Sequence, residues 1–144
     1  MVKFKFSNKK KFLIAEAGIN HNGKLKTALD LVDTAKTNGA DAIKFQTYKT
    51  EKRINKKYKK IFEILKNCEL GYEDFKKIND YCKKKKIIFF STPFDKEAVD
   101  FLETLKVPLY KVASFDISNY DLLKKIIATK KTTIVSTGMA NMLE

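Results

Sequence analysis

The sequence has few of the residues that bind metals or form disulfides. Its 144 residues include one histidine, His21, and two cysteines. Protein metal sites usually need three or four His, Cys or acidic ligands, and His21 falls in a turn without a second histidine. We therefore expect no metal site built from this chain alone. Cys68 and Cys82 form no CxxC motif and fall in helical patterns, which predicts free, buried thiols.

Long apolar runs are also missing. No segment approaches the ~20 apolar residues that a membrane-spanning helix requires. The basic start, residues 1–6, is not followed by the apolar segment and the small-residue cleavage site of a secretory signal. We therefore expect a cytoplasmic protein that has no membrane partner.

Arginine is almost absent from a strongly basic chain. Among the 30 Lys and Arg residues, which give a formal net charge of +13, only Arg53 is an arginine. Recognition of bases and phosphates in nucleic acids depends on forked guanidinium groups. The lysines fall in short runs such as residues 83–86, which are typical of solvated faces. We therefore expect no nucleic-acid partner, although the positive field can attract an anionic substrate.

Short apolar runs alternate with amphipathic segments along most of the chain. The strand-like runs are residues 11–15, 41–46, 87–90, 109–112 and 133–135. The segments with helical periodicity are residues 25–38, 61–65, 72–85, 95–105 and 119–129. This alternation predicts an α/β fold in which crossover helices join parallel strands. Periodicity alone leaves a doubly wound sheet and a barrel equally open.

Polar residues gather at the carboxyl ends of these predicted strands, where parallel α/β folds place their reactive groups. They are Glu16, Lys44, Gln46, Thr92, Lys111, Ser114, Asp116 and Ser136. A single Ser or Thr at such a position is most often a helix cap. Glu16 alone can equally be a salt-bridge partner, a ligand for sugar hydroxyls, or an acid or base.

Lys44 and Lys111 are unusual because each interrupts an apolar run. An unpaired buried ammonium group is costly, so each lysine must reach solvent or meet an anion. Two such lysines at matching strand ends, with hydroxyl groups nearby, predict a site for a phosphate or a carboxylate.

Five segments match one enzyme family in the same order. They are AEAGINHNG at 15–23, GADAIKFQT at 39–47, STPF at 91–94, YKVAS at 110–114 and STGM at 136–139. From about residue 12 to its end, the chain resembles the N-acetylneuraminate (sialic acid) synthases, which include legionaminic and pseudaminic acid synthases. The resemblance implies a partial TIM (β/α)₈ barrel of about four and a half βα units. Residues 1–144 would form its N-terminal half, without the second half or the antifreeze-like domain.

The resemblance also implies a reaction. These synthases join phosphoenolpyruvate to the aldehyde form of an N-acetylated amino sugar, giving a nonulosonic acid and phosphate for surface polysaccharides. A divalent metal, Mn²⁺ or Mg²⁺, polarises the sugar aldehyde in the family, and its histidine ligands would come from strands beyond Glu144. The full-length enzymes are homodimers. We therefore expect the isolated chain to be inactive.

Site residues can be carried over where the segments match. The resemblance implies that phosphoenolpyruvate is held by Lys44, Thr92, Lys111, Ser114 and Ser136. Glu16 matches a carboxylate that contacts the sugar, and Gln46 lies in the same pocket.

One segment departs from the family pattern. Residues 113–116 read Ala-Ser-Phe-Asp where the family often has Gly-Ser-Gly-Glu. Asp116 thus keeps an acidic group that is shorter by one methylene, and with Glu16 it is the second catalytic candidate.

Two other functions are compatible with the residues. One is a lysine aldolase, in which Lys44 or Lys111 forms a Schiff base with a carbonyl substrate. The other is a non-catalytic half-barrel that acts as a binding or assembly module. The sequence does not specify the amino sugar.

Overall fold

The computed structural model describes residues 4–7 and 11–141. Its elements, in chain order, are β1 (Ile14–Gly18), α1 (Leu25–Thr37), β2 (Ala42–Thr47), α2 (Thr50–Arg53), α3 (Lys59–Asn67), α4 (Tyr72–Lys85), β3 (Ile88–Pro93), α5 (Lys96–Thr104), β4 (Leu109–Val112), the 3₁₀ turn η1 (Ser114–Asp116), α6 (Tyr120–Ala128) and β5 (Thr132–Val135). The predicted alternation of strands and helices is confirmed.

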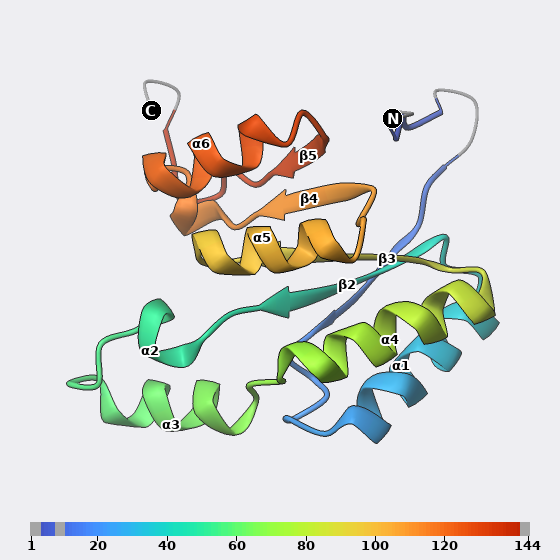
Figure 1. Cartoon of the computed structure of the whole chain (residues 1–144), viewed down its shortest axis with the longest axis horizontal. Helices are drawn as coiled ribbons and strands as arrows, with labels where there is room; N and C mark the ends of the chain where they lie inside the picture. The colour runs from blue at the N-terminus through green and yellow to red at the C-terminus, as the bar shows by residue number, and fades with distance from the viewer. Residues whose placement is uncertain (1–3, 8–10, 142–144) are drawn as a thin grey trace.

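The five strands form one parallel sheet in which neighbours follow chain order, β1-β2-β3-β4-β5 (Figure 1). A doubly wound sheet reverses direction partway, so that its helices cover both faces. Here every crossover runs the same way and places its helix on the same face. This is the winding of a TIM barrel, and the open sheet contains four βα units and a fifth strand. The fold is therefore α/β, a partial barrel.

The main core lies between the outer face of the sheet and helices α1, α4, α5 and α6. Strand residues such as Phe45 and Tyr110 point into it and are completely buried. Phe45 packs edge-on against Phe75 of α4 and contacts Phe89 of β3. Burying a large apolar side chain contributes roughly 1.5–3 kcal/mol. This packing fixes which side chains are left for the opposite, inner face.

The inner face has two layers. Alternation along a strand puts Ala42, Lys44 and Gln46 on the same face, and the register pairs Lys44 with Phe90 and Gln46 with Thr92. Near the amino ends of the strands the side chains are apolar. We call this the apolar layer; it consists of Ala42, Phe90 and Leu109 with Phe4, Phe12, Ile14, Ile88 and Ile134 packed against them. Toward the carboxyl ends the inward side chains are polar.

The beginning of the chain covers the apolar layer. The rings of Phe4, Phe6 and Phe12 meet edge to face, with centroids 5.1–5.4 Å apart. The Thr132 hydroxyl at the start of β5 donates a hydrogen bond to the Phe4 carbonyl. The segment 4–6, here called the N-terminal strap, therefore connects to the last described strand.

Several strand boundaries differ from the prediction. The first strand was expected at residues 11–15 but lies at Ile14–Gly18, so Glu16 is inside it rather than after it. Leu13 is 56% exposed, so its apolar side chain does not mark a buried strand. Pairing with β2 shifts between Glu16 and Gly18, where Gly18 has φ +53°. β3 likewise extends to Pro93 and includes Thr92.

Both cysteines are free and buried, as predicted. Burial raises the pKa of the Cys82 thiol to about 12, so this group is inert at neutral pH. Among the described residues, no helix has the length and apolarity needed to span a membrane.

Candidate functional site

Lys44 is at the centre of the polar side chains on the inner face. It is 8% exposed, and its Nζ lies 2.6 Å from Glu16 Oε2 and 2.9 Å from Oε1. It also donates a hydrogen bond of 3.3 Å to the Thr92 hydroxyl. Glu16 and Lys44 are register partners on β1 and β2. The Glu16 carboxylate of the same chain thus supplies the negative charge that the buried Lys44 ammonium requires.

Lys111 on β4 is paired differently. Its Nζ donates to the Ser136 hydroxyl at 2.5 Å and to the Val112 carbonyl at 2.6 Å. In the described part of the chain, no carboxylate lies within salt-bridge distance of it. Burial lowers the pKa of Lys111 and the charge of Lys44 lowers it further, while Glu16 acts in the opposite direction. Both ammonium groups therefore lie on the inner face, and the charge of each opposes that of the other.

Gln46 and Glu16 lie close together near Gly18. A Cβ added to Gly18 would be 3.1 Å from Glu16 Oε1 and 3.5 Å from Gln46 Nε2. The absence of a side chain at Gly18 therefore leaves room for these two polar groups. Ser91 belongs to the other face, because its hydroxyl bonds to that of Thr47 at 2.8 Å. Of the two hydroxyls at the end of β3, only Thr92 reaches Lys44.

Ser114 and Asp116 lie in η1, directly after β4. Asp116 is buried; its Oδ1 accepts a hydrogen bond from Asn119, while its Oδ2 is buried with no partner among the described residues. Burial raises the pKa of Asp116, and the Asn119 hydrogen bond and the charge of Arg53 only partly offset this. Asp116 is therefore a carboxyl group that holds its proton more readily than an exposed aspartate.

Arg53 belongs to the same region, although the sequence analysis did not select it. It is the last residue of α2, and its Nη1 donates a 3.1 Å hydrogen bond to Gln46 Oε1. The guanidinium lies 3.8 Å from the ring centroid of Phe94 and 4.6 Å from that of Tyr48. Burial lowers the pKa of Arg53. The only signal in the sequence was that a single arginine stands in a lysine-rich segment.

The described residues do not fit a divalent metal. In residues 4–7 and 11–141, no three His, Cys, Asp or Glu side chains are close enough to hold an ion. His21 is buried and stacks on Phe45. Its Nδ1 accepts a 3.2 Å hydrogen bond from the Gly23 amide, and burial lowers its pKa. We therefore assign no chemical step to a metal held by this chain.

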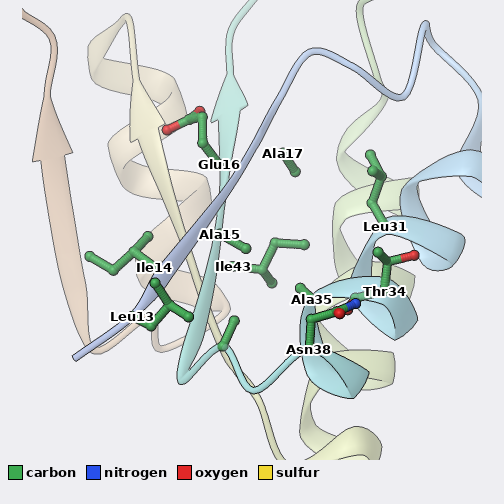
Figure 2. Close-up of a pocket in the computed structure, with 11 residues that line it drawn as sticks. Leu13, Ile14, Ala15, Glu16, Ala17, Leu31, Thr34, Ala35, Asn38 and Ile43 are labelled. Carbon is green, nitrogen blue, oxygen red and sulfur yellow. The ribbon is translucent and has the colours of Figure 1, made fainter. Parts of the chain in front are cut away.

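A cavity of about 330 Å³ lies on the other side of β1, against α1. Its wall is mostly aliphatic, with Leu31, Ala35 and Ile43 among its residues, and its polar groups are Glu16, Thr34 and Asn38. Figure 2 shows the Glu16 carboxylate pointing away from α1. Neither lysine lines this cavity. The cavity therefore shares only Glu16 with the polar cluster on the inner face, which carries the chemistry.

A partial barrel with clustered lysines at the carboxyl ends of its strands is the architecture of an α/β-barrel synthase. The chain belongs to the NeuB family, whose family model matches residues 31–144. This membership confirms the resemblance to sialic, legionaminic and pseudaminic acid synthases, and it places the chain in a family of sugar-biosynthesis synthases.

Individual relatives agree with this assignment. The chain is 40% identical to N,N'-diacetyllegionaminic acid synthase of Campylobacter jejuni, over 94% of the chain and 45% of the relative. It is 47% identical to an uncharacterized protein of Methanocaldococcus jannaschii, over 92% of the chain and 39% of the relative.

A solved structure shows the same fold. The N-acetylneuraminic acid synthetase of Leptospira borgpetersenii in complex with citrate matches with a TM-score of 0.89 and 39% identity, over 92% of this chain and 46% of that one. The chain therefore spans less than half the length of each of these proteins.

Proposed function

We propose that the chain is the phosphoenolpyruvate-binding half of a nonulosonic acid synthase, which condenses phosphoenolpyruvate with the aldehyde form of an N-acetylated amino sugar. The surroundings of Lys111 are the main support for the proposal. Its ammonium group donates to the neutral oxygen atoms of Ser136 and Val112 and is repelled by the charge of Lys44. Two neighbouring ammonium groups repel each other, and an anion bound between them removes that repulsion.

The surrounding groups suit the two anionic ends of phosphoenolpyruvate. Lys44 and Lys111 supply charge, while Thr92, Ser114 and Ser136 supply hydroxyl donors. Charge-assisted hydrogen bonds of this kind are about twice as strong as neutral ones. Donors already in place around a departing phosphate also stabilise the charge that develops on it. In this proposal the bound anion replaces Glu16 in part as the negatively charged acceptor for the Lys44 ammonium.

The proposed chemistry proceeds in two stages. Carbon three of phosphoenolpyruvate attacks the sugar aldehyde, forming the new C–C bond, and water adds at carbon two. The resulting tetrahedral intermediate then releases phosphate. Glu16 would accept hydrogen bonds from sugar hydroxyls. Asp116 would exchange a proton, because burial raises the pKa of its carboxyl group in the direction of neutral pH.

We further propose that residues 1–144 form the N-terminal half of the barrel domain and that the isolated chain has no synthase activity. The complete enzyme would be a cytoplasmic homodimer. Its divalent metal would be bound by residues outside this chain.

Titration calorimetry with phosphoenolpyruvate tests the proposal. We expect Lys111→Met to weaken binding about 10- to 100-fold, because a hydrogen bond to a charged group contributes roughly 1.5–3 kcal/mol. Lys124→Met is the matched control, since Lys124 lies on the exposed surface of α6. If the unchanged chain does not bind phosphoenolpyruvate, or if Lys111→Met binds it equally well, the proposal is wrong.

A lysine aldolase remains the second candidate because a lowered lysine pKa also favours Schiff-base formation. Borohydride reduction in the presence of pyruvate distinguishes the two functions. A covalent adduct on Lys111 would favour the aldolase, whereas a synthase should give none.

A further inference from the structure

Arg53 and Gln46, the only arginine and the only glutamine of the chain, are joined by a hydrogen bond. We infer that Arg53 is a positioning residue that turns the Gln46 side-chain amide so that its NH₂ group is available as a hydrogen-bond donor beside Glu16. The further step, that this donor contacts the amino sugar, rests on the proposed function.

Hydrogen-bond chemistry determines the orientation of the amide. A guanidinium group has five N–H donors and no acceptor. The Gln46 atom that lies 3.1 Å from Arg53 Nη1 must therefore be the carbonyl oxygen, Oε1. The NH₂ group is thereby directed away from Arg53. Without Arg53, either end of the amide could face the site.

The freed NH₂ group lies next to Glu16. Gln46 Nε2 and Glu16 Oε1 are both within 3.5 Å of the point that a Cβ on Gly18 would occupy. Glu16 is 54% exposed at its side chain, so this edge of the polar cluster is open to a ligand. The pair offers one donor and one acceptor side by side, because an ionised carboxylate only accepts hydrogen bonds.

Arg53 is itself held by aromatic stacking. Its guanidinium covers the Phe94 ring, which also stacks on Phe115 at 5.7 Å with an interplanar angle of 9° and meets Tyr48 edge to face. Tyr48 lies at 4.6 Å on another side. A planar guanidinium lies flat on a ring while its edge donates hydrogen bonds in fixed directions, a geometry that the compact ammonium group of lysine does not reproduce. The Phe115 that replaces the family's glycine thus supports the ring on which Arg53 lies.

The short helix α2 that carries Arg53 is fixed by Glu69. The Glu69 carboxylate accepts hydrogen bonds from the Thr50 amide at 2.9 Å and from the Thr50 hydroxyl at 2.8 Å. Although burial alone would raise it, hydrogen bonds from Thr50, Lys49 and Lys66 lower the pKa of Glu69 to about 2. The carboxylate therefore stays ionised at neutral pH, and α2 remains anchored.

This arrangement specifies what a ligand must present. The substrate should carry a hydroxyl proton toward Glu16 and a lone pair, on a hydroxyl or an acetamido carbonyl, toward Gln46. An analogue that lacks this oxygen would leave the Gln46 NH₂ group without that partner and should bind less tightly.

Selective labelling tests the positioning role directly. Because the chain has one glutamine, ¹⁵N-labelled glutamine side chains give a single pair of amide proton signals. We expect Arg53→Leu and Arg53→Lys to shift these signals. Lys52→Leu, in the same helix, should leave them unchanged because Lys52 pairs with Glu97 instead. If both Arg53 variants keep the wild-type signals, the inference is wrong.

The sugar contact is tested with N-acetylmannosamine added to the chain in the presence of phosphoenolpyruvate. We expect Arg53→Leu to weaken sugar binding about 3- to 10-fold, as for one neutral hydrogen bond, and to leave the affinity for phosphoenolpyruvate within about twofold. In a Gln46→Ala background the Arg53 change should have no further effect, and additive effects would overturn the inference. If the wild-type chain binds no sugar, the proposed function fails at that step, while the amide signals still decide the position of Gln46.

Discussion

The two layers of the inner face are built on the same strands but have opposite properties. Phe90 in the apolar layer is completely buried. Thr92, two residues further along β3 on the same face, accepts a hydrogen bond from Lys44. The two positions are separated by only about 6.6 Å of strand. The comparison teaches that stability and ligand binding are divided along each strand, because apolar packing in one half offsets the cost of burying Lys44 and partly burying Lys111 in the other half.

Substitutions at these two positions should have unequal effects, and they test the comparison most strongly. We expect Phe90→Ala to reduce the free energy of unfolding by about 3–5 kcal/mol, through lost apolar burial and the cavity left behind. Thr92→Val should cost only about 0.5–1.5 kcal/mol, as expected for one lost hydrogen bond. Urea unfolding followed by circular dichroism measures both. Equal losses of stability would mean that the two layers do not differ as described.

A smaller effect is expected when the internal partner of Lys44 is neutralised. Glu16→Gln removes a carboxylate that competes with an incoming anion for the Lys44 ammonium. We therefore expect inorganic phosphate and phosphoenolpyruvate to bind about two- to fivefold more tightly, in line with the ~0.2–1 kcal/mol of a partly exposed ion pair. Titration calorimetry checks this, and Glu73→Gln, at an exposed pair with Lys76, is the control. Weaker anion binding by Glu16→Gln would contradict the competition.

The smallest effect concerns Asp116 and pH. Burial raises its pKa above the ordinary value of 3.8 in the folded chain. The folded state therefore binds more protons than the unfolded state between 3.8 and the raised pKa, so the stability supplied by protonated Asp116 is lost as pH rises through that window. We expect Asp116→Asn to be more stable than the wild type at neutral pH and to lose this advantage below pH 3.8. Thermal unfolding at pH values across this range measures the difference in stability between the variant and the wild type. A difference that does not change with pH would contradict the burial of a charged carboxyl group.

Much of the fold could be predicted from the sequence because the core obeys simple periodicity. The helix expected at residues 72–85 has those bounds in the structure, since Phe75, Ile78 and Cys82 form one buried stripe. The strand expected at 109–112 is likewise found there. The choice between a doubly wound sheet and a barrel could not be made from periodicity, because it depends on strand order, which only tertiary packing reveals.

The candidate site was predictable where its residues interrupt apolar strands. Lys44 and Lys111 stood out for that reason, and the structure places both on the inner face. The pairing of Lys44 with Glu16 was not foreseen, because it depends on the register of β1 against β2. Arg53 was missed because α2 has only four residues and no periodicity. Its relevance comes from contacts with Gln46 and Phe94, and Phe94 is brought to it by the pairing of β2 with β3 rather than by the local sequence.

The N-terminal strap has a consequence for how the chain is made. The carbonyl of Phe4 accepts a hydrogen bond from the hydroxyl of Thr132, so this contact cannot form until a residue 128 positions further along the chain has been synthesised. At about 5–20 residues per second, bacterial and eukaryotic synthesis would leave the three phenylalanine rings at this end uncovered for many seconds. The strap therefore reaches its final position on the apolar layer only after the fifth strand has been made.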